Sequence, residues 1–165
     1  MDINEKNKEL YSRLFVSCSD IHFARQCARH ILKKGWHCDP WERRGTIYFQ
    51  QSVYTTALIV SYARPFTKSA GWPSFPTRLL QYTEAERGLH KKLLKLRNKI
   101  YAHSDSESYS IRPYRSGSYS VDIVGEPFLK ISEDEAVQFL EMTAKGLASI
   151  EDRMQQLRPS VEKIY

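Results

Sequence analysis

The stretch TEAERGLHKKLLKLRNKIYAH, residues 83–103, predicts an amphipathic helix that decides the fold class of the chain. Thr83, followed three residues later by Glu86, has the capping-box pattern of a helix N-terminus. Four apolar residues then recur at helical spacing and form one core-facing stripe, namely Leu89, Leu93, Leu96 and Ile100. We therefore expect a helix over about residues 84–103 that packs against other helices.

Toward the N-terminus, the same kind of signal predicts a first helix that begins at a capping box of Asp2 and Glu5. This helix should end at Gly35, because glycine adopts the left-handed conformation that terminates many helices. The polar residues 17–19 leave open whether the segment forms one helix or two.

A second helix is expected over about residues 44–64, stopped by Pro65. Its many β-branched and aromatic residues also fit a strand, but its length and its apolar spacing favour a helix. The proline-containing residues 66–82 predict a loop with a short helical turn near residues 77–81.

Toward the C-terminus, residues 109–114 and 119–124 alternate in polarity and flank the turn residues 115–118. This pattern predicts a β-hairpin within about residues 107–126. The tyrosines and arginines of the hairpin suit contact with single-stranded RNA, but a tyrosine-rich hairpin packed on the helices is the favoured alternative.

A last helix begins at a capping box of Ser132 and Glu135 and should end before Pro159. Its apolar stripe comprises Ala136, Leu140, Thr143, Leu147, Ile150, Met154 and Leu157. The sequence thus predicts one mainly α-helical domain over residues 1–165, a helical bundle with a small β-hairpin between its third and fourth main helices.

The bulk composition favours a polyanionic partner and no membrane. The formal charge is +6, from 25 basic and 19 acidic residues, which suits nucleic acid. No apolar run approaches the roughly 18 residues that cross a bilayer. The acidic, polar N-terminus is not a secretory signal, so we expect a cytoplasmic location.

The cysteines do not suggest a metal centre. Cys18, Cys27 and Cys38 contain no Cys-x-x-Cys pair, which disfavours a zinc ribbon and a disulfide framework. We expect buried free thiols and no metal or other cofactor; a site built from His30, His37 and Cys38 is the minor alternative.

The apolar stripe of the helix at residues 84–103 continues to His103, and Arg97 lies on the other border of that stripe. An imidazole exchanges protons near neutral pH, and a guanidinium offers a planar fork of donors to phosphate. A helix-terminal histidine beside an ordinary surface arginine explains the same pair. Asp105 would either fix the tautomer of His103 or cap the following loop.

The segment Leu-Arg-Asn-Lys-Ile-Tyr-Ala-His-Ser-Asp, residues 96–105, resembles the signature of the HEPN superfamily of helical domains. That signature is an arginine, commonly followed by a polar residue such as asparagine, with a histidine a few positions later. The form with alanine before the histidine and aspartate two residues after it is most similar to the abortive-infection, AbiU-like branch. The resemblance covers about ten residues strongly and otherwise rests on helix order and on residues 61–64.

The resemblance implies an antiparallel helical bundle that forms a homodimer and brings two Arg/His sets into one cleft. Many HEPN members are metal-independent endoribonucleases that act as toxins or in antiviral defence. By position, His103 would be the general acid/base, Arg97 would stabilise the charge on the phosphoryl oxygens, and Asn98 would orient the phosphate or His103. Because the ribose 2′-OH is the nucleophile, RNA would be cut and DNA would not.

Four further residues are expected to contact the substrate: Lys99, Asp105, Tyr62 and Arg64. Tyr62 and Arg64, at the end of the second helix, also fit a core tyrosine and a helix-terminal cation. Some HEPN toxins carry a tyrosine two positions after the histidine, where a partner antitoxin adds AMP. Asp105 occupies that position here, which argues against this form of control.

Two rival functions stay open at this point. One is a non-catalytic HEPN nucleotide-binding or partner-assembly module, paired with an antitoxin or another inhibitory partner. The other is a DNA-binding regulator, which the net charge permits but for which no helix-turn-helix pattern is found.

Overall fold

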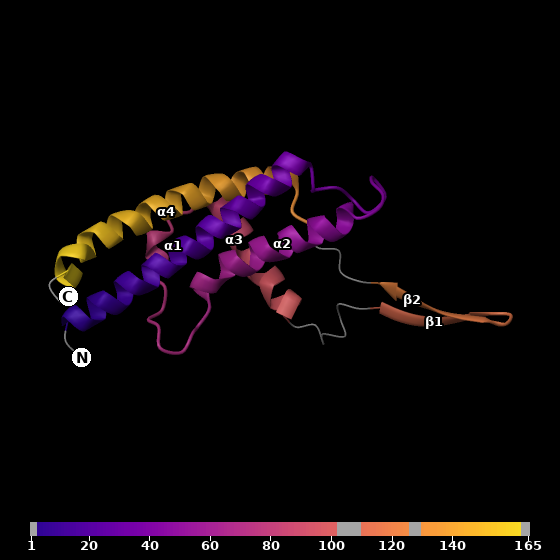
Figure 1. Cartoon of the computed structure of the whole chain (residues 1–165), viewed down its shortest axis with the longest axis horizontal. Coiled ribbons are helices and arrows are strands. Elements are labelled where there is room, and N and C mark those ends of the chain that lie inside the picture. Colours follow the sequence, from indigo (N-terminus) through magenta and orange to yellow (C-terminus); the bar gives the residue numbers. More distant parts are fainter. Residues whose placement is uncertain (1–2, 102–109, 126–129, 163–165) are drawn as a thin grey trace.

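The computed structural model describes residues 3–101, 110–125 and 130–162, with the backbone alone at residues 99–101 and 125. These residues form four α-helices, two short 3-10 turns and one two-stranded antiparallel sheet (Figure 1). The chain is thus mainly helical, and the hairpin lies between the third and fourth helices, as the sequence predicts. None of the described helices combines the length and the apolar character that a membrane span needs.

Helix α1 (Ile3–Lys34) is one continuous helix. Ser17 does not break it: this residue is buried inside the helix, and its hydroxyl donates to the carbonyl of Arg13 one turn earlier (2.8 Å). The helix ends as expected at Gly35, whose φ is 63°. The backbone N–H groups of residues 35 and 36 donate to carbonyls of the last turn at 3.2 and 3.0 Å, which is a Schellman C-cap.

Helix α2 (Ile47–Ala63) begins later than the sequence predicts. The residue responsible is Gly45, whose φ of 79° turns the chain just before the helix and excludes a start at residue 44. At its C-terminal end α2 continues into the 3-10 turn η1 (Arg64–Phe66), which contains Pro65. The buried guanidinium of Arg13 donates to the Pro65 carbonyl (2.6 Å) and ties this turn to α1.

Helix α3 (Glu84–Tyr101) begins at the predicted capping box, and a second 3-10 turn, η2 (Thr77–Leu79), precedes it. The Thr83 N–H donates to the Glu86 carboxylate (2.8 Å), and the Glu86 N–H donates to the Thr83 hydroxyl (3.3 Å). Glu86 is buried and also accepts from Lys145 of the fourth helix at 2.6 Å. The N-terminal turn of α3 is therefore fixed both locally and across the bundle.

Helix α4 (Glu133–Val161) has the predicted capping box of Ser132 and Glu135. The expectation that it ends before Pro159 is wrong. Proline removes one helical hydrogen bond, but the turn is held because the Ser160 hydroxyl donates to the Leu157 carbonyl (2.7 Å) and Val161 is buried. Burial of the last apolar side chain therefore outweighs the lost bond.

The four helices surround one core. Helix α1 packs against α2 on one side and α4 on the other, and α3 contacts both α2 and α4 (Figure 1). Helix α4 runs antiparallel to α1 and to α3, because residues later in α1 and α3 contact residues earlier in α4: Asn7 contacts Ser160 but Arg25 contacts Thr143, and Glu86 contacts Lys145 but Lys92 contacts Glu135. The largest fully buried side chains include Leu14, Ile31, Leu58, Tyr62, Leu93 and Phe139.

The hairpin consists of β1 (Ser110–Ser116) and β2 (Tyr119–Gly125), with Ser116 paired to Tyr119 around a two-residue turn. Gly117 in that turn has a φ of 60°, which favours glycine. All side chains of residues 110–124 are exposed, and the hairpin extends away from the helices in Figure 1. The alternative that the hairpin packs on the bundle is therefore wrong.

Candidate nucleic-acid site on helix α3

The C-terminal turns of α3 carry the described part of the Arg/His segment. Arg97 is half-buried, its Nη1 donates to the Asn98 side-chain oxygen (3.2 Å), and Asn98 is exposed. His103, Asp105 and the side chain of Lys99 lie outside the described residues, so the roles expected of them stay predictions. The structure places Arg97 and Asn98 in the C-terminal turns of α3, a helix that packs against α2 and α4.

Helix α3 concentrates the positive charge of the chain. Residues 87–101 contain six lysines and arginines and no acidic residue, so their formal charge equals the +6 of the whole chain. Arg87 pairs with Glu84 (2.9 Å), and Lys92 pairs with Glu135 of α4. Lys91 and Lys95 are exposed and form no ion pair with a carboxylate of the described residues.

This row of cations costs stability unless an anion approaches it. Lys91, Lys95 and Lys99 follow one another at four-residue spacing, and like charges at that spacing destabilise a helix by about 0.2–0.5 kcal/mol per pair. Cations near a helix C-terminus also interact favourably with the helix dipole, which offsets part of that cost. The signal that sequence reasoning missed is the absence of any acidic residue from this run.

Tyr62 is a core residue. Its side chain has 0% exposure, and its hydroxyl lies 2.8 Å from Nδ1 of His90 and 3.4 Å from the Tyr82 hydroxyl. Burial raises its pKa well above the usual range, so the hydroxyl stays protonated. The substrate contact expected of Tyr62 is at odds with this position, because core side chains cover the ring completely.

Arg64 begins the turn η1 and points a largely exposed side chain (62%) toward α1, where it pairs with Asp20 at 3.2 Å. An exposed pair of this kind contributes about 0–1 kcal/mol, so the guanidinium can exchange Asp20 for another anion. The substrate contact expected of Arg64 stays a prediction, and the helix-terminal cation is an equally good description of the observed position.

Sequence reasoning missed His90, which lies beside Leu89 on the packed face of α3. Its imidazole ring makes edge-to-face contacts with Tyr62, Phe66 and Tyr82. Burial, and to a smaller extent the charge of Lys91, lowers its pKa, so the ring is neutral near pH 7. An aromatic enclosure of this kind suits a structural histidine better than one that binds phosphate.

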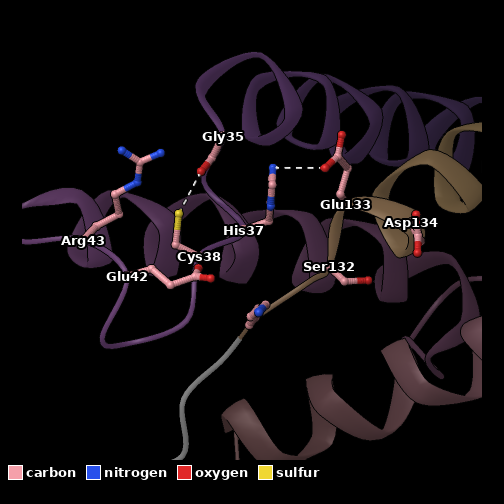
Figure 2. Close-up of a pocket in the computed structure, with 9 residues that line it drawn as sticks. Gly35, His37, Cys38, Glu42, Arg43, Ser132, Glu133 and Asp134 are labelled. Carbon is pink, nitrogen blue, oxygen red and sulfur yellow. Dashed lines mark hydrogen bonds and ion pairs between the residues drawn. The ribbon is translucent and has the colours of Figure 1, made fainter.

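A wide hollow of about 830 Å³ lies between the loop after α1 and the start of α4 (Figure 2). Its lining comprises Gly35, His37, Cys38, Glu42, Arg43, Lys130, Ser132, Glu133 and Asp134. Lys130 pairs with Asp39 (2.8 Å), and His37 faces Glu133 across 3.8 Å. Because carboxylates face these basic groups, the hollow is a poor site for a polyanion.

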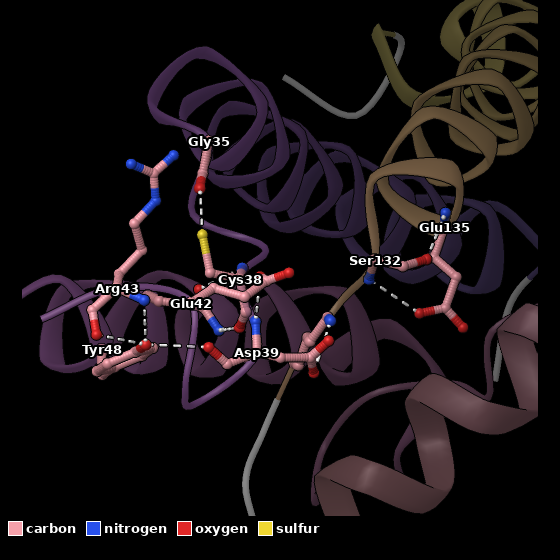
Figure 3. A network of polar contacts seen from close by, with 10 residues as sticks. Gly35, Cys38, Asp39, Glu42, Arg43, Tyr48, Ser132 and Glu135 are labelled. Carbon is pink, nitrogen blue, oxygen red and sulfur yellow. Dashed lines mark hydrogen bonds and ion pairs between the residues drawn. The ribbon is translucent and has the colours of Figure 1, made fainter.

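Figure 3 shows that backbone and side-chain hydrogen bonds fix the wall of this hollow. The Tyr48 hydroxyl accepts from the Arg43 N–H (2.7 Å) and donates to the Asp39 carbonyl (3.0 Å). The buried Gln51 side chain both accepts from and donates to the backbone of Cys38, at 2.9 and 3.1 Å. The loop after α1 is therefore held against α2 by hydrogen bonds, and an ion pair connects it to the start of α4.

The alternative metal site is not assembled in the described part of the chain. His30 stacks on Tyr54 with ring centres 4.5 Å apart, and the Cys38 thiol donates to the Gly35 carbonyl (3.2 Å). No group of three His, Cys, Asp or Glu side chains among the described residues is placed to hold a metal ion. Cys18, Cys27 and Cys38 are free thiols, and burial raises the pKa of the Cys27 thiol.

A comparison with protein-family models, curated proteins and solved structures finds no match to this chain. Its function is therefore inferred from the chemistry of its own residues. Among the described surfaces, the C-terminal half of α3 fits a polyanion best, because it alone joins an arginine and an amide to a run of cations without carboxylates.

Proposed function

We propose that this protein is a metal-independent endoribonuclease of the HEPN type, acting as a toxin or in phage defence in the cytoplasm. The observation that carries the proposal is the acid-free basic run of α3, which leads to Arg97 and Asn98 and, a few residues further along the chain, to His103. A single-stranded or looped RNA supplies both the phosphates that these cations attract and the 2′-OH that the chemistry needs.

The proposed reaction uses the imidazole and the guanidinium in separate roles. His103 accepts the proton of a ribose 2′-OH as that oxygen attacks the adjacent phosphorus. The bond to the 5′-oxygen breaks, this oxygen takes up a proton, and a 2′,3′-cyclic phosphate and a 5′-hydroxyl end result. Arg97 stabilises the charge on the phosphoryl oxygens, and Asn98 and Lys99 position the backbone.

We further propose that two copies form a homodimer through α1 and α2. The support is an uncovered, mainly apolar groove of about 440 Å³ between these helices, lined by Phe23, Gln26, Cys27, His30, Val53, Tyr54 and Ala57. Phe23 and Val53 are about half-exposed, and the nearby Phe49 of α2 is largely exposed. Contiguous apolar surface of this kind commonly marks a protein interface.

The same groove supports the alternative, a non-catalytic HEPN nucleotide-binding or partner-assembly module. In that case α1 and α2 would bind another protein, such as an antitoxin, and the cations of α3 would hold a nucleotide without cleaving RNA. The two proposals differ in whether a phosphodiester bond is broken.

The test is cleavage of single-stranded RNA in EDTA, with the same sequence carrying 2′-deoxyribose as the uncleavable comparison. We expect cyclic-phosphate products from RNA alone and a loss of about 10²–10⁴-fold in rate for His103→Ala. His22→Ala is the matched control, because His22 is an exposed histidine of α1 far along the chain from the motif. Cleavage that survives His103→Ala, or no cleavage of any RNA by the purified protein, would contradict the catalytic proposal.

A further inference from the structure

The two faces of the hairpin differ in chemistry. Residues paired across the two strands share a face, so the register places Tyr114 opposite Val121 and Arg112 opposite Ile123 on one face. Tyr119, two residues before Val121, lies on the same face. This face, which we call the tyrosine face, therefore carries two aromatic rings, two aliphatic side chains and one guanidinium.

The tyrosine face is uncovered. Tyr114 is 55% and Tyr119 78% exposed, and Val121 and Ile123 are each about half-exposed. A two-stranded hairpin with no third strand or helix against it is marginally stable in water. The side chains that would stabilise it by burial are thus available to a partner.

Charge decides which partner fits. Arg112 is the charged residue of the tyrosine face, and the hairpin's acidic residue, Asp122, points to the opposite face with Pro113. A second copy packed face to face would bury Arg112 against a surface without a carboxylate, and an unpaired buried charge is strongly unfavourable. Nucleic acid instead offers phosphates to Arg112 and bases to the tyrosine rings.

Chain connectivity limits the distance between the base of the hairpin and the proposed catalytic residue. Six residues lie between His103 and Ser110 at the start of β1, so seven Cα–Cα steps keep the base of the hairpin within about 25 Å of His103. Tyr114 and Tyr119 are diagonal neighbours on one face, about 7–8 Å apart, which leaves room for a base against each ring.

We propose that the tyrosine face of the hairpin binds single-stranded RNA, with bases stacked on Tyr114 and Tyr119 and a phosphate held by Arg112. This inference rests on the proposed RNA cleavage for its choice of nucleic acid. In this proposal the hairpin binds unpaired nucleotides. RNA whose bases are enclosed in a duplex should therefore bind the tyrosine face poorly.

The experiment measures binding without cleavage. Fluorescence anisotropy at fixed salt follows a labelled single-stranded 2′-O-methyl oligouridylate of about 12 nucleotides, which spans a typical site and has no 2′-OH to react. Tyr114→Ala and Tyr119→Ala should each weaken binding by about 5- to 140-fold, which is 1–3 kcal/mol per stacked base at 1.4 kcal/mol per tenfold. The phenylalanine variants should keep the affinity, because the ring and not the hydroxyl makes the contact.

Two further variants guard against a simple loss of hairpin structure. Arg112→Gln leaves both rings in place and should lower the salt dependence of binding, log K against log salt, by about 0.7. Ile111→Ala with Val124→Ala removes a cross-strand apolar pair from the opposite face and should leave the affinity unchanged.

The outcomes separate this inference from the catalytic proposal. Unchanged oligonucleotide affinity in Tyr114→Ala and Tyr119→Ala, or a change of oligomeric state in sedimentation with affinity intact, overturns the RNA-binding face and points to a protein interface. Loss of affinity in the two alanine variants upholds it, even if the protein cleaves no RNA. If cleavage depends on His103 while the tyrosine variants bind RNA normally, the catalytic proposal is upheld and only the RNA-binding role of the hairpin is overturned.

Discussion

The two halves of helix α3 are built for different tasks. The first half is held from several sides: Glu86 is bound to Thr83 and Lys145, and His90 is enclosed by aromatic rings. In the second half Leu96 is only partly buried, and Lys95 and Asn98 are exposed. The same helix thus passes from a turn whose side chains are fixed within the fold to turns that carry exposed polar and basic side chains.

This difference shows where evidence for function can be found in a small helical protein. In the first half the charged and polar side chains other than Lys91 have a partner within the fold, so their chemistry is explained by stability. In the second half Lys95 is exposed and forms no ion pair with a carboxylate of the described residues, and its spacing to Lys91 and Lys99 costs stability that a bound anion would offset. Variants should therefore separate the halves, with effects on folding in the first and on RNA in the second.

The largest effect on folding is expected at Leu89, which is buried in the first half. Leu89→Ala should lower the free energy of unfolding by about 2–5 kcal/mol, because it removes packed atoms and leaves a cavity. Lys95→Ala, on the exposed side of the second half, should change it by less than about 0.5 kcal/mol. Urea unfolding of both variants measures the difference, and equal losses would contradict the division of the helix.

A smaller, pH-dependent effect is expected at His90. Since burial lowers its pKa in the folded protein, the unfolded chain binds the proton more tightly. The free energy of unfolding should therefore fall as the pH drops below about 6.5, the pKa of an unperturbed histidine. In His90→Gln, which keeps an acceptor for Tyr62, thermal unfolding should lose this part of the pH dependence; an identical pH profile would mean that His90 does not carry it.

Local signals in the sequence predicted most of the helix ends. The capping boxes at Thr83 and Ser132 and the glycine at position 35 act within one helical turn, so their effect can be predicted without the rest of the fold. The start of α2 was missed because Gly45 was included in an otherwise helical pattern. The end of α4 was missed because the burial of Val161 beyond Pro159 depends on tertiary packing.

The candidate site was predictable only in part. Arg97 and Asn98 lie on the C-terminal turns of α3 as expected, since their position follows from helical periodicity. Tyrosine is a common residue type in ligand-binding sites, so the sequence alone could not show that Tyr62 belongs to the core. The packing of His90 and Phe139 against its ring shows it. No periodicity could show that the hairpin lies uncovered, because a strand alternates in the same way whether or not one face is packed.

The most direct test of the account is the rate of RNA cleavage by Arg97→Ala, compared with its thermal stability. Arg29→Ala is the matched control, because Arg29 is an exposed arginine of α1. We predict that Arg97→Ala unfolds within a few degrees of the unmodified protein but loses about 10²-fold or more in cleavage rate, as expected when a donor to a developing oxyanion is removed, while Arg29→Ala keeps both. Full cleavage activity in a folded Arg97→Ala variant would contradict the assignment of this half of α3 to RNA.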